Sequence, residues 1–529
     1  MRLHDFLDYR AREQGEAEFA VHGERSITYR AAQVEIHQLA NALINCCGLR
    51  SGDRIAILSK NSIEYMLLYF AASKVGLVTI PLNYRLSPGE WSYILNDAEA
   101  KVLFAAGEYL QDVETIGSNL KTVQEFIAIN GLDALSLGSQ LGWQTYQDFI
   151  ANQPDTPPNR IVVTTDDVFQ LYTSGTTGHP KGAILTHQAV TTHILQMGLA
   201  HNIQPGERLL LVAPVFHVAA LNAGAFPCLA AGGCLYIQSD FKPNEVVRAL
   251  SEEKIGMAIL VPAMIQACLT AVPDVAQRRY ADLRLIHYGA SPIAEATLRR
   301  AIETFKCEFS QGYGMTEMSA AISILSWIDH QRALREKPEL LLAAGRPVLG
   351  TQVRVVDAND HDVPNGTIGE VLARGPQMMK GYWKLPEATE EALHGGWMHT
   401  GDAGVLDDEG YLYIQDRVKD MIVSGGENIY PRVVEDVLFK HPAVAEVAVI
   451  GVPDEQWGET IKAIIVLRPG MTATAEEIIG FCLGKLGGFE RPRSVDFVNA
   501  LPRTPSGKVL KRELREPYWT GQSRRVGQV

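Results

Sequence analysis

Short apolar runs alternate with amphipathic stretches through the first part of the chain. Residues 54–58 (RIAIL) and 77–80 (LVTI) predict strands, and residues 63–75 between them carry the apolar spacing of a helix. Two further runs, 101–104 and 126–129, predict strands in the same series. Because strands that alternate with helices pair in parallel through right-handed crossovers, this region predicts an α/β unit.

A second series of apolar runs predicts another α/β unit. Strands are expected at 209–213, 258–261 and 285–288, and each ends in a turn of small or polar residues. Residues 309–317 (FSQGYGMTE) end a further strand in the same way. Ligands of open α/β sheets bind at the carboxyl ends of the strands, so we expect these turns to converge on one crevice.

From about residue 346 the pattern changes to short strands joined by turns, such as 353–356 and 369–372, which predicts a small antiparallel or barrel-like unit. The last part of the chain mixes helices and strands and predicts a separate domain. The expected fold class is therefore α/β. A large N-terminal domain, 1–416, consists of two α/β subdomains plus a small β-barrel, and a small α+β C-terminal domain, 417–529, follows.

Composition and charge argue against several kinds of partner for this protein. The 529 residues carry a net charge of −13, which argues against a nucleic-acid partner and against a basic membrane-binding face. The seven cysteines include no CxxC pair and the N-terminus is charged, so we expect reduced thiols, no signal peptide and a cytoplasmic location. A homodimer and a peripheral membrane contact stay open, although no basic amphipathic stretch demands the latter.

One uncharged stretch, 209–239, is long enough to span a bilayer as a helix. Pro214, Pro227, Gly232 and Gly233 interrupt it. A strand–turn–helix–strand segment of an α/β core fits these interruptions better, so we expect no transmembrane segment.

The stretch Tyr172–Gly182, YTSGTTGHPKG, is the strongest candidate for chemistry. It places glycines, hydroxyl side chains and Lys181 between an expected strand, 168–172, and an expected helix from about Gln188. Such a loop offers backbone N–H groups, hydroxyls and a mobile cation to an anion, so we interpret it as a loop that holds nucleotide phosphates. It is not a Walker P-loop, because Gly182 follows Lys181 where that motif has Ser or Thr. The alternative, a flexible surface linker, rarely carries this set of residues.

Four motifs that lie far apart in the sequence agree with one another: 172–182, 313–317 (YGMTE), 400–402 (TGD) with 416–420 (DRVKD), and 505–508 (PSGK). Together they resemble the adenylate-forming superfamily of acyl-CoA synthetases, luciferases and peptide-synthetase adenylation domains, in the order of that family and over nearly the whole chain. The chain looks most like bacterial fatty-acyl-CoA and aryl-CoA ligases. The resemblance implies that a carboxylate attacks the α-phosphate of ATP, that pyrophosphate leaves, and that the thiol of CoA then takes the acyl group.

The resemblance also implies roles at the nucleotide. The phosphate loop would grip the β- and γ-phosphates, Thr316 would bond the α-phosphate, and Glu317 would hold Mg²⁺, which prefers oxygen ligands. Asp402 would accept the ribose hydroxyls, and Lys508 would be the main catalytic lysine, assisted by Lys181. The ATP- and AMP-binding residues implied are Thr173, Ser174, Gly175, Thr176, Thr177, Gly178, Lys181, Gly289, Ala290, Ser291, Gln311, Gly312, Tyr313, Thr316, Asp402, Arg417 and Lys508.

After adenylation the C-terminal domain of such enzymes rotates, and Lys419 matches the hinge position. The rotation would bring the face around Gly425 and Gly426 to the active site and open a tunnel for CoA. Four residues resemble positions that contact CoA in the aryl-CoA ligases. For each of them, ordinary packing on the protein surface is the alternative. These residues are Arg85, Trp457, Phe489 and Arg491.

The acyl pocket is expected from residues 217–224, 289–290 and 318–322. These segments are small and apolar and hold no Arg or Lys, so a second carboxylate on the substrate would be left unpaired. We therefore expect a medium- or long-chain fatty acid first, and an aryl, alicyclic, steroid or terpenoid acid second. His217 is expected to gate the pocket, with a purely structural histidine as the alternative. The lining residues expected are His217, Ala220, Gly224, Met318 and Ala320.

Three other functions stay open. A module that loads a carrier protein shares the adenylation step, and luciferase-like oxygenation shares the core motifs. A nucleotide-binding regulator on an inactive scaffold is disfavoured, because Lys181, Glu317, Asp402, Arg417 and Lys508 are all present.

Overall fold

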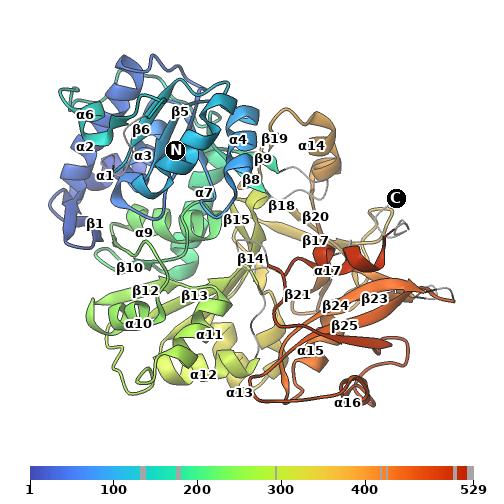
Figure 1. Cartoon of the computed structure of the whole chain (residues 1–529). Helices are drawn as coiled ribbons and strands as arrows, with labels where there is room; N and C mark the ends of the chain where they lie inside the picture. The colour runs from blue at the N-terminus through green and yellow to red at the C-terminus, as the bar shows by residue number, and fades with distance from the viewer. Residues whose placement is uncertain are drawn as a thin grey trace. The chain divides into compact units, whose positions relative to one another are not determined.

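The computed structural model describes residues 1–131, 139–173, 180–291, 293, 295–417, 420–424, 427–454, 456–503 and 509–520, without the side chains of residues 416, 417, 427 and 428. The chain, drawn in Figure 1, divides into two compact units. The larger unit comprises Met1–Val353 with Ala373–Met398, and the smaller unit comprises Arg354–Leu372 with His399–Val529.

The first sheet of the larger unit confirms the α/β prediction. Neighbouring strands pair in parallel from β4 through β3 and β5 to β6, and the buried helix α3 (Ile63–Lys74) connects β3 with β4. The strand order is β19-β9-β8-β4-β3-β5-β6-β7. These strands are β19 (Gly381–Tyr382), β9 (Lys181–Thr186), β8 (Asp167–Thr173), β4 (Val78–Pro81), β3 (Arg54–Leu58), β5 (Ala100–Ala105), β6 (Glu125–Ala128) and β7 (Gln144–Thr145).

The prediction of strand, loop and helix around Lys181 is wrong in one respect. Strand β9 lies between the loop and helix α7 (His187–His201), and it pairs antiparallel with β8, so that Thr173 stands opposite Lys181. The segment is therefore a hairpin, and no helix N-terminus follows the loop directly. The short apolar run 183–185, which is almost entirely buried, was the signal for this strand.

The second sheet of the larger unit has the strand order β16-β15-β14-β13-β12-β10-β11-β1-β2. Neighbours from β14 to β1 pair in parallel, and β15 runs antiparallel to β14. The strands are β16 (Arg346–Pro347), β15 (Ala320–Leu325), β14 (Glu308–Met315), β13 (Leu285–Gly289), β12 (Ile255–Ile259), β10 (Arg208–Leu211), β11 (Cys234–Ile237), β1 (Glu18–His22) and β2 (Arg25–Thr28).

One apolar core joins the two sheets. Buried side chains from α1 (Leu3–Gln14), α2 (Tyr29–Asn45), α3, α7 and α9 (Phe226–Ala231) form a single cluster with residues of both sheets. Burial of this apolar surface holds the two sheets in a fixed relation, so that turns from both can contribute to one site. Further helices of this unit are α4 (Pro88–Asp97), α5 (Leu110–Ile116), α6 (Tyr146–Ile150), α10 (Pro243–Glu252), α11 (Pro262–Ala271), α12 (Glu295–Phe305), α13 (Trp327–Arg335) and α14 (Pro386–Ala392).

Residues 209–239 confirm the expected strand–turn–helix–strand segment. Between β10 and β11 lie helix α8 (Val218–Ala220), a π-helical turn (Leu221–Ala225) and α9. Among the residues that the structure describes, no helix is long and apolar enough to cross a membrane. The seven cysteines are free thiols, as expected.

The smaller unit holds most of a sheet with the order β17-β18-β20-β21 and a second sheet with the order β23-β22-β25-β24, in which β26 pairs with β25. Helices α15 (Pro431–Leu438) and α16 (Ala475–Phe481) share one apolar core with the second sheet. The strands are β17 (Gln352–Val356), β18 (Gly369–Arg374), β20 (Met398–Leu406), β21 (Leu412–Arg417), β22 (Ile422–Ser424), β23 (Glu427–Ile429), β24 (Val444–Asp454), β25 (Gly458–Leu467) and β26 (Ser494–Phe497), and α17 (Lys511–Arg515) follows.

Candidate active site

Glu317 lies in a one-turn 3-10 helix, Thr316–Met318, which follows the carboxyl end of β14. Its side chain is only 6% exposed, and Oε1 accepts a hydrogen bond of 2.8 Å from the hydroxyl of Tyr382. The hydroxyl of Thr173, at the end of β8, lies 3.5 Å from the same oxygen. The structure thus brings two predicted residues together from different sheets and adds Tyr382, which the sequence reasoning missed.

These oxygen atoms fit a magnesium ion. Mg²⁺ is usually held by one or two carboxylates together with phosphate oxygens and water, and it does not need a cage of protein ligands. Among the described residues, no group of three or more His, Cys, Asp or Glu side chains could hold a metal ion. A buried carboxylate beside two hydroxyls meets the requirement.

The turn after Glu317 is strained. Ser319 has φ of 57° and Ala320 has φ of 149°, both of which are uncommon for residues with a Cβ atom. Such conformations cost about 1–3 kcal/mol each and persist only where the surroundings hold them. Gly314 permits the turn, because a Cβ atom there would lie 1.7 Å from the carbonyl oxygen of Ala320.

A buried polar network holds this turn. Asn222 Nδ2 donates to the carbonyl oxygen of Ser319 (2.8 Å), and Ser319 Oγ donates to the carbonyl oxygen of Gln377 (2.7 Å). The Gln377 amide in turn donates to Thr351 Oγ1 at 2.6 Å. Because buried polar groups must be paired, these contacts fix the backbone that carries Thr316 and Glu317.

His193 supports the same turn from α7. Its Nε2 atom accepts a hydrogen bond of 3.2 Å from the backbone N–H of Ala321, and its Nδ1 atom lies 3.0 Å from Gln196 Oε1. Burial lowers the pKa of His193 to about 4. Sequence reasoning missed this residue, and the signal for it is a set of buried polar side chains on α7 that includes His193 and Gln196.

The expected adenine slot lies where β13 ends beside β14. Gly289 stands opposite Gly312, and a Cβ atom on Gly289 would lie 2.4 Å from the carbonyl oxygen of Gly312. Ala290 has φ of 65°, which turns the chain sharply after β13. Ser291, Gln311 and Tyr313 are partly exposed around this point. The structure therefore brings together the small residues that the sequence assigned to the adenine.

Only the two ends of the expected phosphate loop can be placed. Thr173 and Lys181 face one another across the β8–β9 hairpin, and Lys181 Nζ lies 5.2 Å from the centroid of the Tyr382 ring. Ser174, Gly175, Thr176, Thr177 and Gly178 lie outside the described residues.

In the smaller unit, Asp402 is 7% exposed and lies within strand β20. Gly401 has φ of 66°, and Thr400 Oγ1 accepts a hydrogen bond of 3.1 Å from the backbone N–H of Asp402. Arg417 stands opposite Asp402 on β21. Outside the described part of this unit lie the side chain of Arg417, and Lys419, Gly425, Gly426 and Lys508.

The residues expected to line the acyl pocket are close-packed. Ala220, Gly224, Met318 and Ala320 are buried, whereas His217 is half-buried with its ring 4.3 Å from that of Phe216, centroid to centroid. A Cβ atom on Gly224 would lie 2.2 Å from Ile259 Cδ1, so only glycine fits here without a shift of Ile259. The π-helical turn 221–225 carries Gly224, and such turns are frequent at functional sites.

The residues expected to contact CoA lie on both units. Arg85 is exposed on the larger unit, whereas Trp457 and Phe489, 43% and 49% exposed, lie on the smaller one with the half-buried Arg491. Exposed aromatic rings of this size are available to stack on a nucleotide base. Each unit is described by itself, so the convergence of these residues on one ligand stays a prediction.

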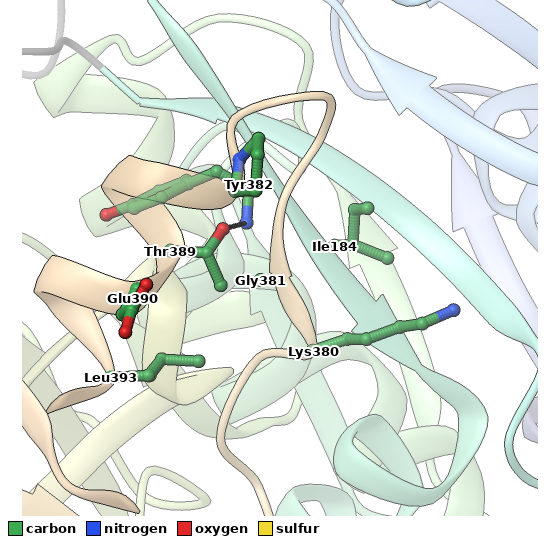
Figure 2. A pocket seen from close by; sticks show the side chains of 8 residues that line it. Ile184, Lys380, Gly381, Tyr382, Thr389, Glu390 and Leu393 are labelled. Carbon is green, nitrogen blue, oxygen red and sulfur yellow. Dashed lines mark hydrogen bonds between the residues drawn. The ribbon is translucent and has the colours of Figure 1, made fainter. Parts of the chain in front are cut away.

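A surface groove of about 390 Å³ lies beside Tyr382. Figure 2 shows its walls: α14 supplies Thr389 and Glu390, Leu393 follows directly after this helix, and the Thr389 hydroxyl faces the backbone N–H of Tyr382 at 2.9 Å. The lining is mainly apolar, and it includes the segment that carries Tyr382. The remaining lining residues are Ile184, Lys380, Gly381 and Pro386.

Comparisons with known proteins agree with this geometry. Residues 7–383 match the family of AMP-binding enzymes, and residues 433–508 match the AMP-binding enzyme C-terminal domain. The chain is 37% identical to ScoC, a fatty acid–[acyl-carrier-protein] ligase of Streptomyces coeruleorubidus, over 95% of this chain and 93% of that protein. It is 36% identical to a feruloyl-CoA synthase of Amycolatopsis sp over 96% and 97% of the two chains.

A solved structure gives the same result for the fold. ATP-bound MatB from Rhodopseudomonas palustris matches with a TM-score of 0.87 at 28% sequence identity, over 98% of this chain and 99% of that one. The α/β fold class and the superfamily expected from the motifs are thereby confirmed. The chain belongs to the AMP-binding enzyme family, within the adenylate-forming superfamily, and is an acid–thiol ligase that uses ATP.

Proposed function

We propose that the chain is an AMP-forming acyl-CoA ligase that activates a carboxylic acid as its adenylate and then transfers the acyl group to the thiol of CoA. One observation supports this most directly. Thr173 ends β8, Glu317 follows β14 of the other sheet, and the two side chains meet at 3.5 Å. A carboxylate suited to a metal ion and a hydroxyl from the phosphate hairpin therefore stand at the same point, as a site for ATP requires.

In the first half-reaction an oxygen of the substrate carboxylate attacks the α-phosphorus, and the bond to pyrophosphate breaks. Thr316 donates a hydrogen bond to the α-phosphate, Lys181 holds the departing pyrophosphate, and Lys508 offsets the repulsion between the two anions. Mg²⁺, held by Glu317 and phosphate oxygens, would neutralise part of the negative charge on the phosphates. Tyr313 stacks on the adenine.

In the second half-reaction the sulfur of CoA attacks the carbonyl carbon, AMP leaves, and a thioester forms. We place the domain boundary between residues 416 and 417, with Lys419 as the hinge. The proposed CoA site combines basic and aromatic side chains, which suit a phosphorylated adenine nucleotide, with two glycines. Its members are Arg85, Gly425, Gly426, Trp457, Phe489 and Arg491.

For the acid we propose a medium- or long-chain fatty acid. The segments around Ala220, Met318 and Ala320 are buried and apolar, which favours an uncharged tail. An aryl acid is the second candidate, because the fatty acid ligase and the feruloyl-CoA synthase are almost equally similar to this chain.

The test is a panel of acids given to the full chain with ATP, Mg²⁺ and free CoA. Pyrophosphate release reports adenylation, and mass spectrometry of the CoA thioester reports transfer. Octanoate or palmitate should turn over at least about tenfold faster than acetate or malonate, because one buried methylene is worth close to a factor of ten in an apolar pocket. Faster turnover of acetate or malonate would overturn the pocket assignment, and ferulate as the best substrate would select the aryl alternative.

A second candidate function is the loading of a carrier protein, which the similarity to ScoC favours. The same acids should be offered with a phosphopantetheinylated acyl carrier protein in place of CoA. Acylation of the carrier protein in this assay, with no acyl-CoA formed in the assay with free CoA, would establish this alternative. Acyl-CoA formation at a rate comparable to or higher than that of carrier acylation would support the CoA ligase.

A further inference from the structure

The side chain of Tyr382 touches two groups, Glu317 and Lys181, to which the proposed function gives roles at the triphosphate of ATP. Its hydroxyl donates to Glu317 Oε1 at 2.8 Å, and its ring centroid lies 5.2 Å from Lys181 Nζ. The first distance is usual for a hydrogen bond to a carboxylate, and the second is usual for a cation–π contact.

The backbone around Tyr382 is fixed on both sides. Lys380 N donates to the carbonyl oxygen of Ile184 at 2.9 Å, and Trp383 N donates to that of Gly182 at 2.8 Å, so β19 is bound to the outer edge of the phosphate hairpin. On the opposite side, Thr389 Oγ1 accepts the N–H of Tyr382 (Figure 2). A side chain on such a fixed backbone has few ways to move, which suits it to orient its neighbours.

The two interactions come from different parts of the phenol. The hydroxyl acts on Glu317, and the ring face acts on Lys181. A substitution that removes only the hydroxyl therefore separates the two effects, and it keeps the ring that packs against the apolar core.

We propose that Tyr382 is a positioning residue whose hydroxyl orients Glu317 toward the metal ion and whose ring holds Lys181 toward the phosphates of ATP. The proposal rests on the roles assigned above to Glu317 and Lys181. Carboxylates that bind metals are themselves hydrogen-bonded, and loss of such a partner typically weakens metal affinity about 10–100-fold.

The test compares Tyr382→Phe and Tyr382→Leu in the full chain. Mn²⁺ replaces Mg²⁺ as the probe, and its binding to the enzyme–ATP complex is measured from the paramagnetic resonance of free Mn²⁺. ATP binding without metal is measured by calorimetry in EDTA. Tyr280→Phe is the matched control, because the Tyr280 hydroxyl also makes one short hydrogen bond, 2.7 Å to the carbonyl oxygen of Val275, and has no role in the site.

Tyr382→Phe should weaken Mn²⁺ binding by about tenfold and leave metal-free ATP binding unchanged. Saturating Mg²⁺ should restore its adenylation rate. Tyr382→Leu should weaken both Mn²⁺ binding and metal-free ATP binding, because it also removes the ring beside Lys181. Tyr280→Phe should match the parent in every measurement.

Parent-like Mn²⁺ binding by Tyr382→Phe would overturn the proposal, and so would an equal loss of metal-free ATP binding in the Phe and Leu variants. Glu317→Gln separates these failures from a failure of the proposed function. If Glu317→Gln loses Mn²⁺ binding while Tyr382→Phe does not, the role of Tyr382 is wrong and that of Glu317 stands. If Glu317→Gln binds Mn²⁺ as the parent does, the metal role of Glu317 itself is wrong.

Discussion

The Nε2 atom of His193 accepts a hydrogen bond from the backbone N–H of Ala321 at 3.2 Å. This contact requires a neutral ring whose proton is on Nδ1, facing Gln196 Oε1. A second proton on the ring would point an N–H group at the N–H of Ala321. The strained turn beside Glu317 is therefore held by a histidine that must stay uncharged.

Acid should destabilise the larger unit through this histidine. The pKa of His193 is about 4 in the folded chain, against 6.5 for an ordinary histidine, because of burial. Between pH 6.5 and 4 the unfolded state therefore binds more protons than the folded state. The free energy of unfolding should be constant above pH 6.5 and fall below it by up to about 1.4 kcal/mol per pH unit for each such histidine. Burial lowers the pKa values of His287 and His330 to about 4 as well.

The measurement is urea unfolding of the parent and of His193→Gln between pH 7.5 and 4.5. Glutamine offers an acceptor to Ala321 without a titrating group, so the variant should show a slope smaller by up to about 1.4 kcal/mol per pH unit. An unchanged slope would contradict the assignment of a neutral His193.

Gly314→Ala should disrupt the turn that carries Glu317. The new Cβ atom would lie 1.7 Å from the carbonyl oxygen of Ala320, so the backbone must shift. We expect a loss of about 3 kcal/mol or more in the free energy of unfolding and a fall in adenylation of about 10²-fold. Gly198→Ala in α7 is the control, because a Cβ atom there meets nothing within 4 Å. This substitution should stabilise the chain by about 0.5–1 kcal/mol.

Much of the fold could be predicted because it follows from local patterns. The runs around Arg54, Ala100 and Leu285 alternate with helices, and parallel pairing follows from that alternation alone. The hairpin at Lys181 was mispredicted, because the three apolar residues of β9 are too few to show a period before α7 begins.

The site was predicted in part for a related reason. Glu317, Thr173 and Gly289 stand in motifs that can be seen in sequence. Tyr382 and His193 act through contacts with residues 65 and 128 positions away, and no local pattern shows such pairs. Only the packing of the two sheets around a shared core brings them together.

Glu317→Gln should abolish most of the adenylation activity and leave the fold intact. Glutamine can still accept the hydrogen bond from Tyr382, but it removes the charge that suits a metal ion. We expect single-turnover formation of the acyl-adenylate to fall by about 10²–10³-fold. Transfer of the acyl group from a synthetic acyl-adenylate to CoA should keep the parent rate, since that step involves no triphosphate. An equal loss in both steps would point to a structural role.

Lys508→Ala should slow adenylation more than Lys181→Ala. Lys181 lies on the hairpin beside the ring of Tyr382. In the proposed function it binds only the departing pyrophosphate. Lys508, outside the described residues, is assigned to the reacting oxygens, where a cation offsets the repulsion as the new bond forms. We expect losses of about 10²–10³-fold for Lys508→Ala and about tenfold for Lys181→Ala in single-turnover adenylation. Equal or reversed losses would contradict this ranking, and reversed losses would make the hairpin lysine the main catalytic cation.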